Sequence, residues 1–350
     1  MVLETFLRKY RFSQIEIEHL LLGTLLFTAV MVSFLIYDFS SLSNPSTILE
    51  IVLLIILTAP LFFLHEIGHK INAQKFNLWA EFRLDQRGVL ITAISIILPI
   101  KFIAPGAVQI RANDYSEIPA MGKVAGYGPA VNIMLGGLFL IITGILNIIY
   151  QFTSIDPSLL SLLLNSFFYA TGFSFFLGLF NMLPFGPLDG WKVKYWNDRV
   201  FWALLIISGL LALETYGSYF LFNQVFLIGT ILNNQNPFVG TFYPFILGVV
   251  VFAIGIFFLK KLADPNWDPG RQPIIQGDYR DYHYYQSPPI QTTRSPAAYH
   301  SSNAPMNTPC AECGKRDLLP FKCTTCGKIY CAEHRLPGKH FCVVDANYGK

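Results

Sequence analysis

The chain has 350 residues, of which 53% are hydrophobic and only 13% are charged, whereas a soluble domain has about 25% charged residues. Charge this sparse cannot cover a soluble globule of this length, so composition excludes an ordinary soluble protein. The net charge of +3 is too small to indicate an acidic partner, and we expect no nucleic acid. The charge is also uneven, since 27 of the 47 charged residues lie within residues 1–259 and 20 lie in the last 91. The chain therefore has an apolar majority and a polar tail.

Six apolar runs in the first 259 residues are long enough to be transmembrane helices, because a bilayer core of about 30 Å requires about 20 apolar residues per helix. The first run follows Glu16 and Glu18 and has no small-residue cleavage site. We therefore expect it to remain as a helix rather than to be removed as a signal peptide. The six runs cover residues 20–37, 47–64, 124–150, 159–183, 200–222 and 240–259.

The basic residues favour one orientation of these helices. Six spans place both termini on one side, and the loops assigned to the opposite side, residues 38–46, 151–158 and 223–239, contain no Lys or Arg. Because cytoplasmic loops carry the excess of Lys and Arg, we expect a multi-pass protein of the cell membrane with both termini in the cytoplasm. All six cysteines lie in the last 41 residues, and in that reducing compartment they favour metal binding over disulfides.

A seventh apolar stretch, residues 89–107, lacks the pattern of a spanning helix. It contains Lys101 and is interrupted by Pro99 and Pro105, and a crossing here would move the later lysines outside. We predict a re-entrant segment of β or loop backbone, which is tolerated at membrane depth only where protein or a water-filled cavity shelters it. The predicted fold is a polytopic α-helical membrane protein with about six transmembrane helices, this re-entrant segment and a small C-terminal zinc-binding domain.

The sequence His65-Glu66-Ile67-Gly68-His69, at the inner end of the second helix, is the first candidate for catalytic chemistry. Positions i and i+4 share a helix face, so both imidazoles can bind one zinc while Glu66 handles the proton of the metal-bound water. Composition predicts only about 0.004 chance matches to this pattern, and ionisable residues at membrane depth are functional by default. The alternative is a pair of interfacial histidines that cap the helix end.

A catalytic zinc has three protein ligands and one open position, so a third ligand is needed. None of the other five histidines lies at a comparable depth near the motif. Among the carboxylates, Asp189 follows the fourth helix on the same side, in a stretch rich in Pro and Gly. Such irregular backbone can present a carboxylate to a metal. The alternative is a turn aspartate that caps the next helix.

Two of these motifs resemble those of the site-2 protease family of intramembrane metalloproteases. The family's H-E-x-x-H corresponds to HEIGH, and its N-x-x-P…L-D-G corresponds to residues 181–190. The resemblance implies that His65, His69 and Asp189 bind the catalytic zinc and that Glu66 is the general base.

A third match, Gly128-Pro129-Ala-Val-Asn132, is similar to the G-P-x-x-N of the same family. By that resemblance Asn132 lies near the site, where its amide could bind substrate backbone or a developing oxyanion, and Asn181 is a second candidate for this role. The alternative for either residue is a hydrogen bond between helices. The family also has a membrane-embedded β region after the H-E-x-x-H helix, which agrees with the prediction for residues 89–107. A strand edge there could pair with an unwound substrate segment.

Residues 264–309 contain eight prolines in 46 positions, which is typical of a linker. This linker separates a membrane metalloprotease domain, residues 1–263, from a tail of residues 310–350. The tail has eight Cys and His residues, the number that two tetrahedral zinc sites require, and it is too short to fold on a hydrophobic core alone. We therefore expect three zinc ions in all, one catalytic and two structural.

The spacing of the tail ligands resembles the AN1-type zinc finger at all eight positions. A site closed by four ligands is structural, so we expect the finger to bind a cytosolic protein partner. Its basic residues leave lipid headgroups as an alternative. The resemblance pairs Cys310, Cys313, Cys331 and His334 on one zinc and Cys323, Cys326, His340 and Cys342 on the other.

Together these features predict an intramembrane zinc metalloprotease that hydrolyses peptide bonds in or near a transmembrane segment of another membrane protein. One alternative is a non-catalytic membrane adaptor that recruits a partner through its finger, but such an adaptor has no use for Glu66 beside a metal. A transporter is a weaker alternative, because the ionisable residues cluster at one depth and form no relay across the bilayer. The pairing of this membrane core with such a finger resembles archaeal proteins.

Overall fold

The computed structural model of the chain describes residues 7, 10–33, 45–98, 101–111, 118–153, 156–185, 188–217, 237–270, 307–316, 320–323, 327–331 and 334. The chain divides into two compact units. The helical unit is Leu22–Ala80 with Leu84–Ile274. The finger unit is Met1–Leu21 with Glu81–Arg83 and Ile275–Lys350.

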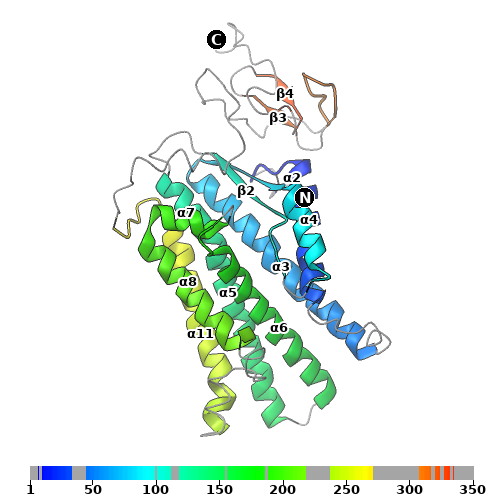
Figure 1. Cartoon of the computed structure of the whole chain (residues 1–350), viewed down its shortest axis with the longest axis vertical. Helices are drawn as coiled ribbons and strands as arrows, with labels where there is room; N and C mark the ends of the chain where they lie inside the picture. The colour runs from blue at the N-terminus through cyan, green and yellow to red at the C-terminus, as the bar shows by residue number, and fades with distance from the viewer. Residues whose placement is uncertain are drawn as a thin grey trace. The chain divides into compact units, whose positions relative to one another are not determined.

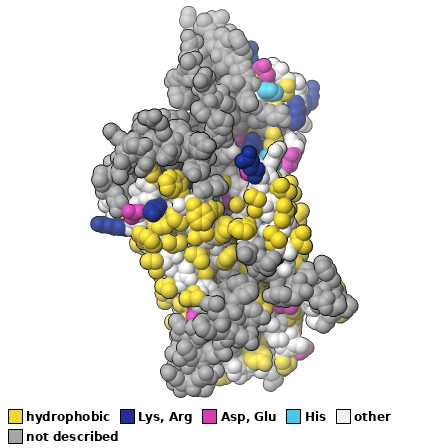
Figure 2. Space-filling model, viewed as in Figure 1, with side chains coloured by type: hydrophobic (Ala, Val, Ile, Leu, Met, Phe, Trp, Pro, Cys, Tyr) yellow, Lys and Arg dark blue, Asp and Glu magenta, His cyan; other side chains and the backbone are white. Residues whose placement is uncertain are grey.

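Five helices in the described part of the chain are long and apolar enough to cross a membrane, and each overlaps one of the predicted spans. On the helical unit, hydrophobic side chains cover much of the face in view (Figure 2). The protein is therefore a membrane protein. The five helices are α2 (Gln14–Ser33), α3 (Pro45–Lys75), α5 (Ile118–Phe152), α6 (Pro157–Asn181) and α11 (Pro237–Leu262).

The predicted span over residues 200–222 is only partly described. Helix α8 (Asp198–Ala212) runs for 15 residues and continues as a π-helix, η3 (Leu213–Gly217), while residues 218–222 lie outside the described residues. The start of α8 is fixed by Asn197, whose side-chain oxygen accepts a hydrogen bond of 3.1 Å from the backbone N–H of Val200. The total of six spans therefore stays a prediction.

Helix α5 is the centre of the helical unit. It packs against α3, α6, α8 and α11, which run beside it, and against the short helix α7 (Asp189–Trp196) at one end (Figure 1). Most residues of the first half of α5 are buried. The motif residues that the sequence places on α3, α5 and α7 therefore meet at this end of the unit.

A two-stranded sheet, β1 paired with β2, follows α3 in the chain. Strand β1 is Trp79–Leu84 and strand β2 is Gly106–Arg111, and helix α4 (Gln86–Ser95) lies between them in sequence. Strand β2 also contacts α3, the helix that carries the HEIGH motif. The second half of the stretch at residues 89–107 thus leads into a strand beside that helix.

The first half of the same stretch differs from the prediction, because its backbone is helical up to Ser95. The carboxylate of Asp85 accepts a hydrogen bond of 2.8 Å from the backbone N–H of Gly88 and so caps α4. Leu90 and Ile91 are 60% and 52% exposed. The prediction of β or loop backbone was wrong here, because Asp85 caps a helix before the prolines are reached. The re-entrant path itself stays a prediction.

Helices α5 and α11 pack backbone to backbone through glycines. A Cβ added at Gly144 would lie 2.4 Å from the backbone nitrogen of Phe245, and one added at Gly137 would lie 2.5 Å from that of Phe252. On the facing helix, a Cβ at Gly248 would lie 2.6 Å from the backbone nitrogen of Ile141. Small residues allow helices in a membrane to approach this closely, and packing then replaces the hydrophobic effect as the source of association.

Gly144→Ala is expected to lower the free energy of unfolding by about 1–3 kcal/mol, because the added methyl group meets backbone that cannot move aside. The matched control is Gly209→Ala on α8, where the new Cβ would meet only the side chain of Leu179 at 3.6 Å. Thermal unfolding of the purified protein in detergent measures both. Equal melting temperatures for the two variants would contradict this account of the α5–α11 contact.

The described part of the finger contains one small hairpin. Strands β3 (Phe321–Lys322) and β4 (Ile329–Tyr330) pair antiparallel, with Phe321 opposite Tyr330. Tyr330 is buried together with three cysteines, in a hydrophobic cluster of Cys310, Cys323, Tyr330 and Cys331. So small a core cannot stabilise the fold of the finger by itself. We therefore expect metal binding to supply most of its folding free energy.

Candidate functional site

Three potential metal ligands meet where α3 and α7 approach each other. His65 and His69 lie one turn apart on α3, and their Nε2 atoms are 3.1 Å apart. Asp189, the first residue of α7, places its Oδ2 3.3 Å from Nε2 of His65 and 3.0 Å from Nε2 of His69. Donor atoms bound to one tetrahedral zinc at 2.0–2.1 Å are about 3.3 Å apart. The three donors therefore fit a single zinc.

Helix α5 approaches these donors closely at Gly128. A Cβ added there would lie 2.4 Å from Nε2 of His69 and 2.6 Å from Nε2 of His65. The side-chain-free position therefore faces the same two nitrogens that face Asp189. Two imidazoles and one carboxylate match the protein ligands of a catalytic zinc, which has three such ligands and one further position for water or substrate.

Both imidazoles are oriented by hydrogen bonds at their other nitrogen. Nδ1 of His65 lies 3.3 Å from Oδ1 of Asn132, and Nδ1 of His69 lies 2.7 Å from the backbone oxygen of Val124. Both partners are acceptors, so each Nδ1 carries the proton and each Nε2 is free to bind a metal. Such outer partners fix the tautomer and the ring orientation of histidine ligands.

Asn132 also connects α5 to α6. Its amide nitrogen donates to the backbone oxygen of Ser174 at 3.3 Å, and the hydroxyl of Ser174 donates to the backbone oxygen of Asn132 at 2.8 Å. Asn132 thus forms the interhelical hydrogen bond that was the alternative to an oxyanion role, and it contacts His65 as well. Asn181 donates its amide to the backbone oxygen of Leu177 in its own helix at 3.1 Å. The oxyanion role of either residue stays a prediction.

Glu66 is buried beside the histidines. Among the described residues, its Oε2 has no hydrogen-bond partner. The backbone N–H of Val108, in β2, faces the carboxylate of Glu66. A buried carboxylate oxygen without a partner is costly unless a ligand or water completes it. The residue predicted to be the general base therefore offers one free oxygen at the site.

Asp189 remains an anion in this setting. Burial alone would raise the pKa of its carboxyl, but the adjacent His69, the hydrogen bonds to both histidines and Lys192 hold that pKa well below its usual range. Its second oxygen, Oδ1, lies 3.6 Å from Nζ of Lys192, one turn along α7.

Gly190, the residue after Asp189, permits close contact with the end of α6. A Cβ added at Gly190 would lie 2.1 Å from the backbone oxygen of Met182.

Some of these contributions were missed in the sequence. Gly128 was part of a recognised motif, but its role beside the ligand nitrogens depends on the distance between α3 and α5. The backbone oxygen of Val124 carries no sequence signal, since any residue supplies one. Lys192 had a signal, because it lies three positions after Asp189, and side chains at i and i+3 meet on one helix face.

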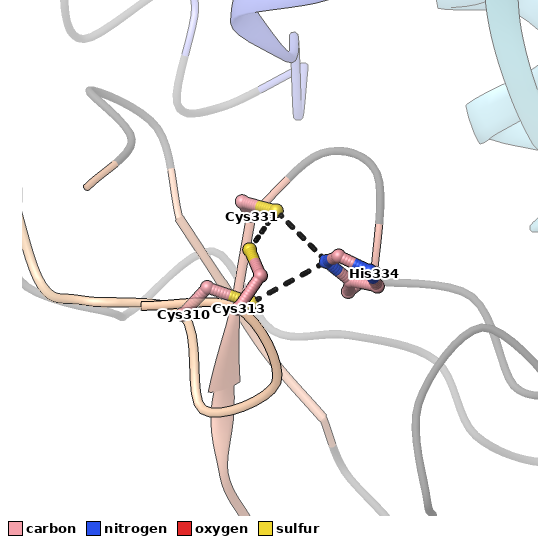
Figure 3. A group of neighbouring side chains, drawn as sticks. All are labelled: Cys310, Cys313, Cys331 and His334. Atoms are coloured by element: carbon pink, nitrogen blue, oxygen red, sulfur yellow. Dashed lines mark hydrogen bonds between the residues drawn. The ribbon is translucent and has the colours of Figure 1, made fainter. Parts of the chain in front are cut away.

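A second metal site lies in the finger unit. Figure 3 shows its four side chains pointing toward one another. The sulfur of Cys313 is 3.8 Å from that of Cys331, and Nδ1 of His334 is 3.7 Å from the sulfur of Cys310 and 3.4 Å from that of Cys331. Sulfur ligands of one tetrahedral zinc, at 2.3 Å from the metal, are about 3.8 Å apart. These four residues are the set that the AN1 resemblance pairs on one zinc.

The second predicted tetrad of the finger is described at one ligand only. Cys323 is fully buried beside β3, whereas Cys326, His340 and Cys342 lie outside the described residues. The pairing of these four on one zinc stays a prediction, as does the total of three zinc ions. The linker of residues 264–309 is described only at its two ends.

Zinc binding by the finger is expected to weaken as the pH falls below about 7. Burial would raise the pKa of the Cys310 thiol, but backbone hydrogen bonds from Cys331, Cys313 and Glu312 lower it to about 7. Only the thiolate binds zinc, so the stabilisation is present at higher pH and is lost as protons compete below that pKa. The zinc affinity of the finger can be measured by competition with a chelator between pH 5.5 and 8. The full-length Asp189→Ala protein is used for this, because it lacks a ligand of the membrane site. Equal affinity at both ends of this range would contradict the prediction.

Comparisons with known proteins bear on the finger and on the family of the chain. Residues 310–347 match the AN1-like zinc finger family. Over 197 residues, the chain is 34% identical to a protein of Methanocaldococcus jannaschii that bears the name "Putative zinc metalloprotease", and the match covers 56% of this chain and 91% of that relative. No solved structure matches the chain. The chain is therefore a zinc metalloprotease homologue with an AN1-type finger, and it belongs to the family of this archaeal relative.

Proposed function

We propose that this protein is an intramembrane zinc metalloprotease of the site-2 type, which hydrolyses peptide bonds in or near transmembrane segments of other membrane proteins. The observation that carries the proposal is the position of the His65, His69 and Asp189 donors. They are buried, they lie at the distances of one zinc site, and two of them belong to a helix long and apolar enough to cross a membrane. Chemistry placed in such a helix acts on substrates that are themselves in the membrane.

The residues divide the chemistry between them. A bound zinc would polarise the scissile carbonyl and lower the pKa of its water to about 7. Glu66 would accept a proton from the attacking water at its free oxygen and would pass it to the leaving amine. Asn132 holds His65 in its ligand tautomer, and the backbone oxygen of Val124 does the same for His69. The amide of Asn132 or of Asn181 is proposed to bind the developing oxyanion.

Strand β2 supports a route for substrate to reach Glu66. A helical peptide bond is closed to attack, because its backbone groups are paired within the helix, so a transmembrane substrate must unwind before hydrolysis. The backbone N–H of Val108 in β2 faces the Glu66 carboxylate. An extended substrate segment that added to this strand would bring its own backbone to the general base.

The basic residues support the proposed orientation. The described lysines Lys123, Lys192 and Lys260 lie at the N-terminal end of α5, in α7 and at the C-terminal end of α11. Lys123 donates to the backbone just after α11, so these ends lie together. We infer that this end faces the cytoplasm of an archaeal cell, with both termini there and with cleavage products released inward.

The finger is proposed to recruit a cytosolic protein, because a zinc closed by four ligands has no open position for catalysis. In the adaptor alternative this recruitment is the whole function. That alternative explains neither the free oxygen of Glu66 nor the glycine at the point where α5 meets the two imidazoles. It is therefore the less supported reading of the membrane unit.

A comparison of two substrate types tests the function. Purified protein in liposomes is offered a membrane protein with a single transmembrane segment and, separately, an unfolded soluble protein. We expect zinc-dependent cleavage of the membrane substrate only, with activity lost on chelation and restored by zinc. Equal cleavage of both substrates would support a general metalloprotease, and cleavage of neither would support the adaptor.

A further inference from the structure

A short segment after α11 packs against the helix that carries Asp189. This segment, residues 263–270, is here called the strap. Its indole Trp267 packs edge-to-face on Trp196, the last residue of α7, with ring centroids 6.0 Å apart at an angle of 71°. Asn197, directly after α7, donates its amide to the backbone oxygen of Gly270 at 2.9 Å. The strap therefore holds the C-terminal end of α7 at two points.

The start of the strap is fixed independently, on α5. Nζ of the buried Lys123 donates to the backbone oxygens of Asp264 and Pro265 at 2.8 and 3.0 Å. A cation at this place also complements the C-terminal end of α11, where helix carbonyls lack partners. The strap is thus attached to α5 at one end and to α7 at the other.

The far end of the strap requires a glycine. Gly270 has φ +92°, a conformation that residues with a Cβ rarely adopt. This conformation occurs at the residue whose carbonyl accepts the hydrogen bond from Asn197. Asp268 supports the same turn, because its carboxylate accepts a hydrogen bond of 3.0 Å from the backbone N–H of Gly270.

The same contacts leave α7 little freedom. Trp196 lies between the strap and α5, since a Cβ added at Gly122 of α5 would lie only 2.2 Å from Cβ of Trp196. Helix α7 has eight residues, so its two ends are about 12 Å apart on one rigid element. Asp189 is at the other end of this helix. On a rigid element, a shift of Trp196 would also move the Asp189 carboxylate.

We propose that the strap positions α7 and thereby holds Asp189 against His65 and His69. Trp267 is the principal positioning residue, and it touches neither metal nor substrate. This inference rests on the metal site of the proposed function. It assigns a role in metal affinity to a residue that lies 78 positions after Asp189 in the sequence and outside every motif of the site.

Zinc affinity of the membrane site, measured in full-length protein, tests the proposal. Cobalt titration distinguishes this site from the finger, because cysteine-bound cobalt has an intense sulfur charge-transfer band that a site with imidazole and carboxylate ligands lacks. Trp267→Ala is expected to weaken metal binding at the membrane site about tenfold, as loss of outer-shell support does elsewhere. The finger bands are expected to be unchanged. Trp267→Phe retains a ring against Trp196 and is expected to restore affinity to near the wild-type value.

The matched control is Trp202→Ala, because Trp202 is 51% exposed and belongs to α8 rather than to α7 or the strap. Its membrane site is expected to bind metal as the wild type does. Wild-type affinity in folded Trp267→Ala protein would overturn the proposal. If that variant does not fold, Gly270→Ala decides, because it acts only at the turn: weakened binding supports the strap and unchanged binding overturns it. Failure of the wild type to bind metal at the membrane site would instead overturn the proposed function.

Discussion

Replacing Glu66 with glutamine is expected to leave zinc content unchanged and to lower the rate of peptide hydrolysis by about 10²–10⁴-fold. Glutamine has nearly the same shape as glutamate but cannot accept a proton from the attacking water. Glu66 lies on the same helix turn as His65 and His69 but is not one of the three donors that meet at the site. The variant therefore separates loss of the general base from loss of the metal.

Two measurements on the same preparation give the result: metal content by elemental analysis, and the initial rate on a membrane-protein substrate. The control is His65→Gln, which removes a ligand of the membrane site. It is expected to lose the zinc of that site and the activity, while the finger keeps its zinc. Wild-type activity in the Glu66→Gln protein would exclude Glu66 as the base. Loss of zinc from that variant would mean that Glu66 supports the ligands rather than the proton transfer.

Gly128→Ala is expected to weaken zinc binding at the membrane site by roughly two orders of magnitude. The new Cβ would lie 2.4 Å from Nε2 of His69 and 2.6 Å from Nε2 of His65, so it would clash with both metal-binding nitrogens. Both rings are held at Nδ1 by Asn132 and Val124, which limits their ability to turn away. The methyl group should therefore push the rings or helix α5 out of place and distort the ligand geometry.

The matched control is Gly126→Ala, two residues earlier on α5. There the nearest atoms to a new Cβ are side-chain carbons of Leu262 and Leu204 at 3.3 and 3.4 Å, which can move by the small amount needed. This variant is expected to bind zinc as the wild type does. Equal zinc affinity in the Gly126 and Gly128 variants would contradict the assignment of Gly128 to the metal site.

The sequence placed His65 and His69 together on one helix, as the structure has them, because that information is local. His65 and His69 are four residues apart on a helix, and helical periodicity alone places both rings on one face. The spacing of Cys310, Cys313, Cys331 and His334 was equally informative, because zinc ligands recur at a few fixed separations. In both cases metal coordination restricts the sequence separation of the ligands, so the separation indicates metal binding.

Contacts between distant segments could not be derived in the same way. The position of Asp189 after the fourth helix made it a candidate ligand and the resemblance assigned it to the metal, but nothing local to residues 181–190 states which helix it faces. The hydrogen bond from Asn132 to Ser174 depends on the packing of α5 on α6. The strap contact of Trp267 with Trp196 joins two aromatic residues that are 71 positions apart and has no sequence signature.

The prediction for residues 89–107 failed in its first half for a different reason. Two prolines and Lys101 led to an expectation of irregular backbone throughout, although the prolines lie after residue 98. The local signal before the two prolines was Asp85, an aspartate at the N-cap position, followed by residues that can form a helix. A short helix therefore precedes the irregular part and β2.

The position of the cleaved bond tests the central claim most directly. Wild-type protein and a substrate with one transmembrane segment are reconstituted in liposomes, and the masses of the product fragments locate the new termini. The account predicts new termini within or at the edge of the apolar segment, on its cytoplasmic half, and no such fragments with Glu66→Gln protein. Cleavage confined to soluble loops far from the membrane, or fragments at the same bond with the Glu66→Gln protein, would contradict it.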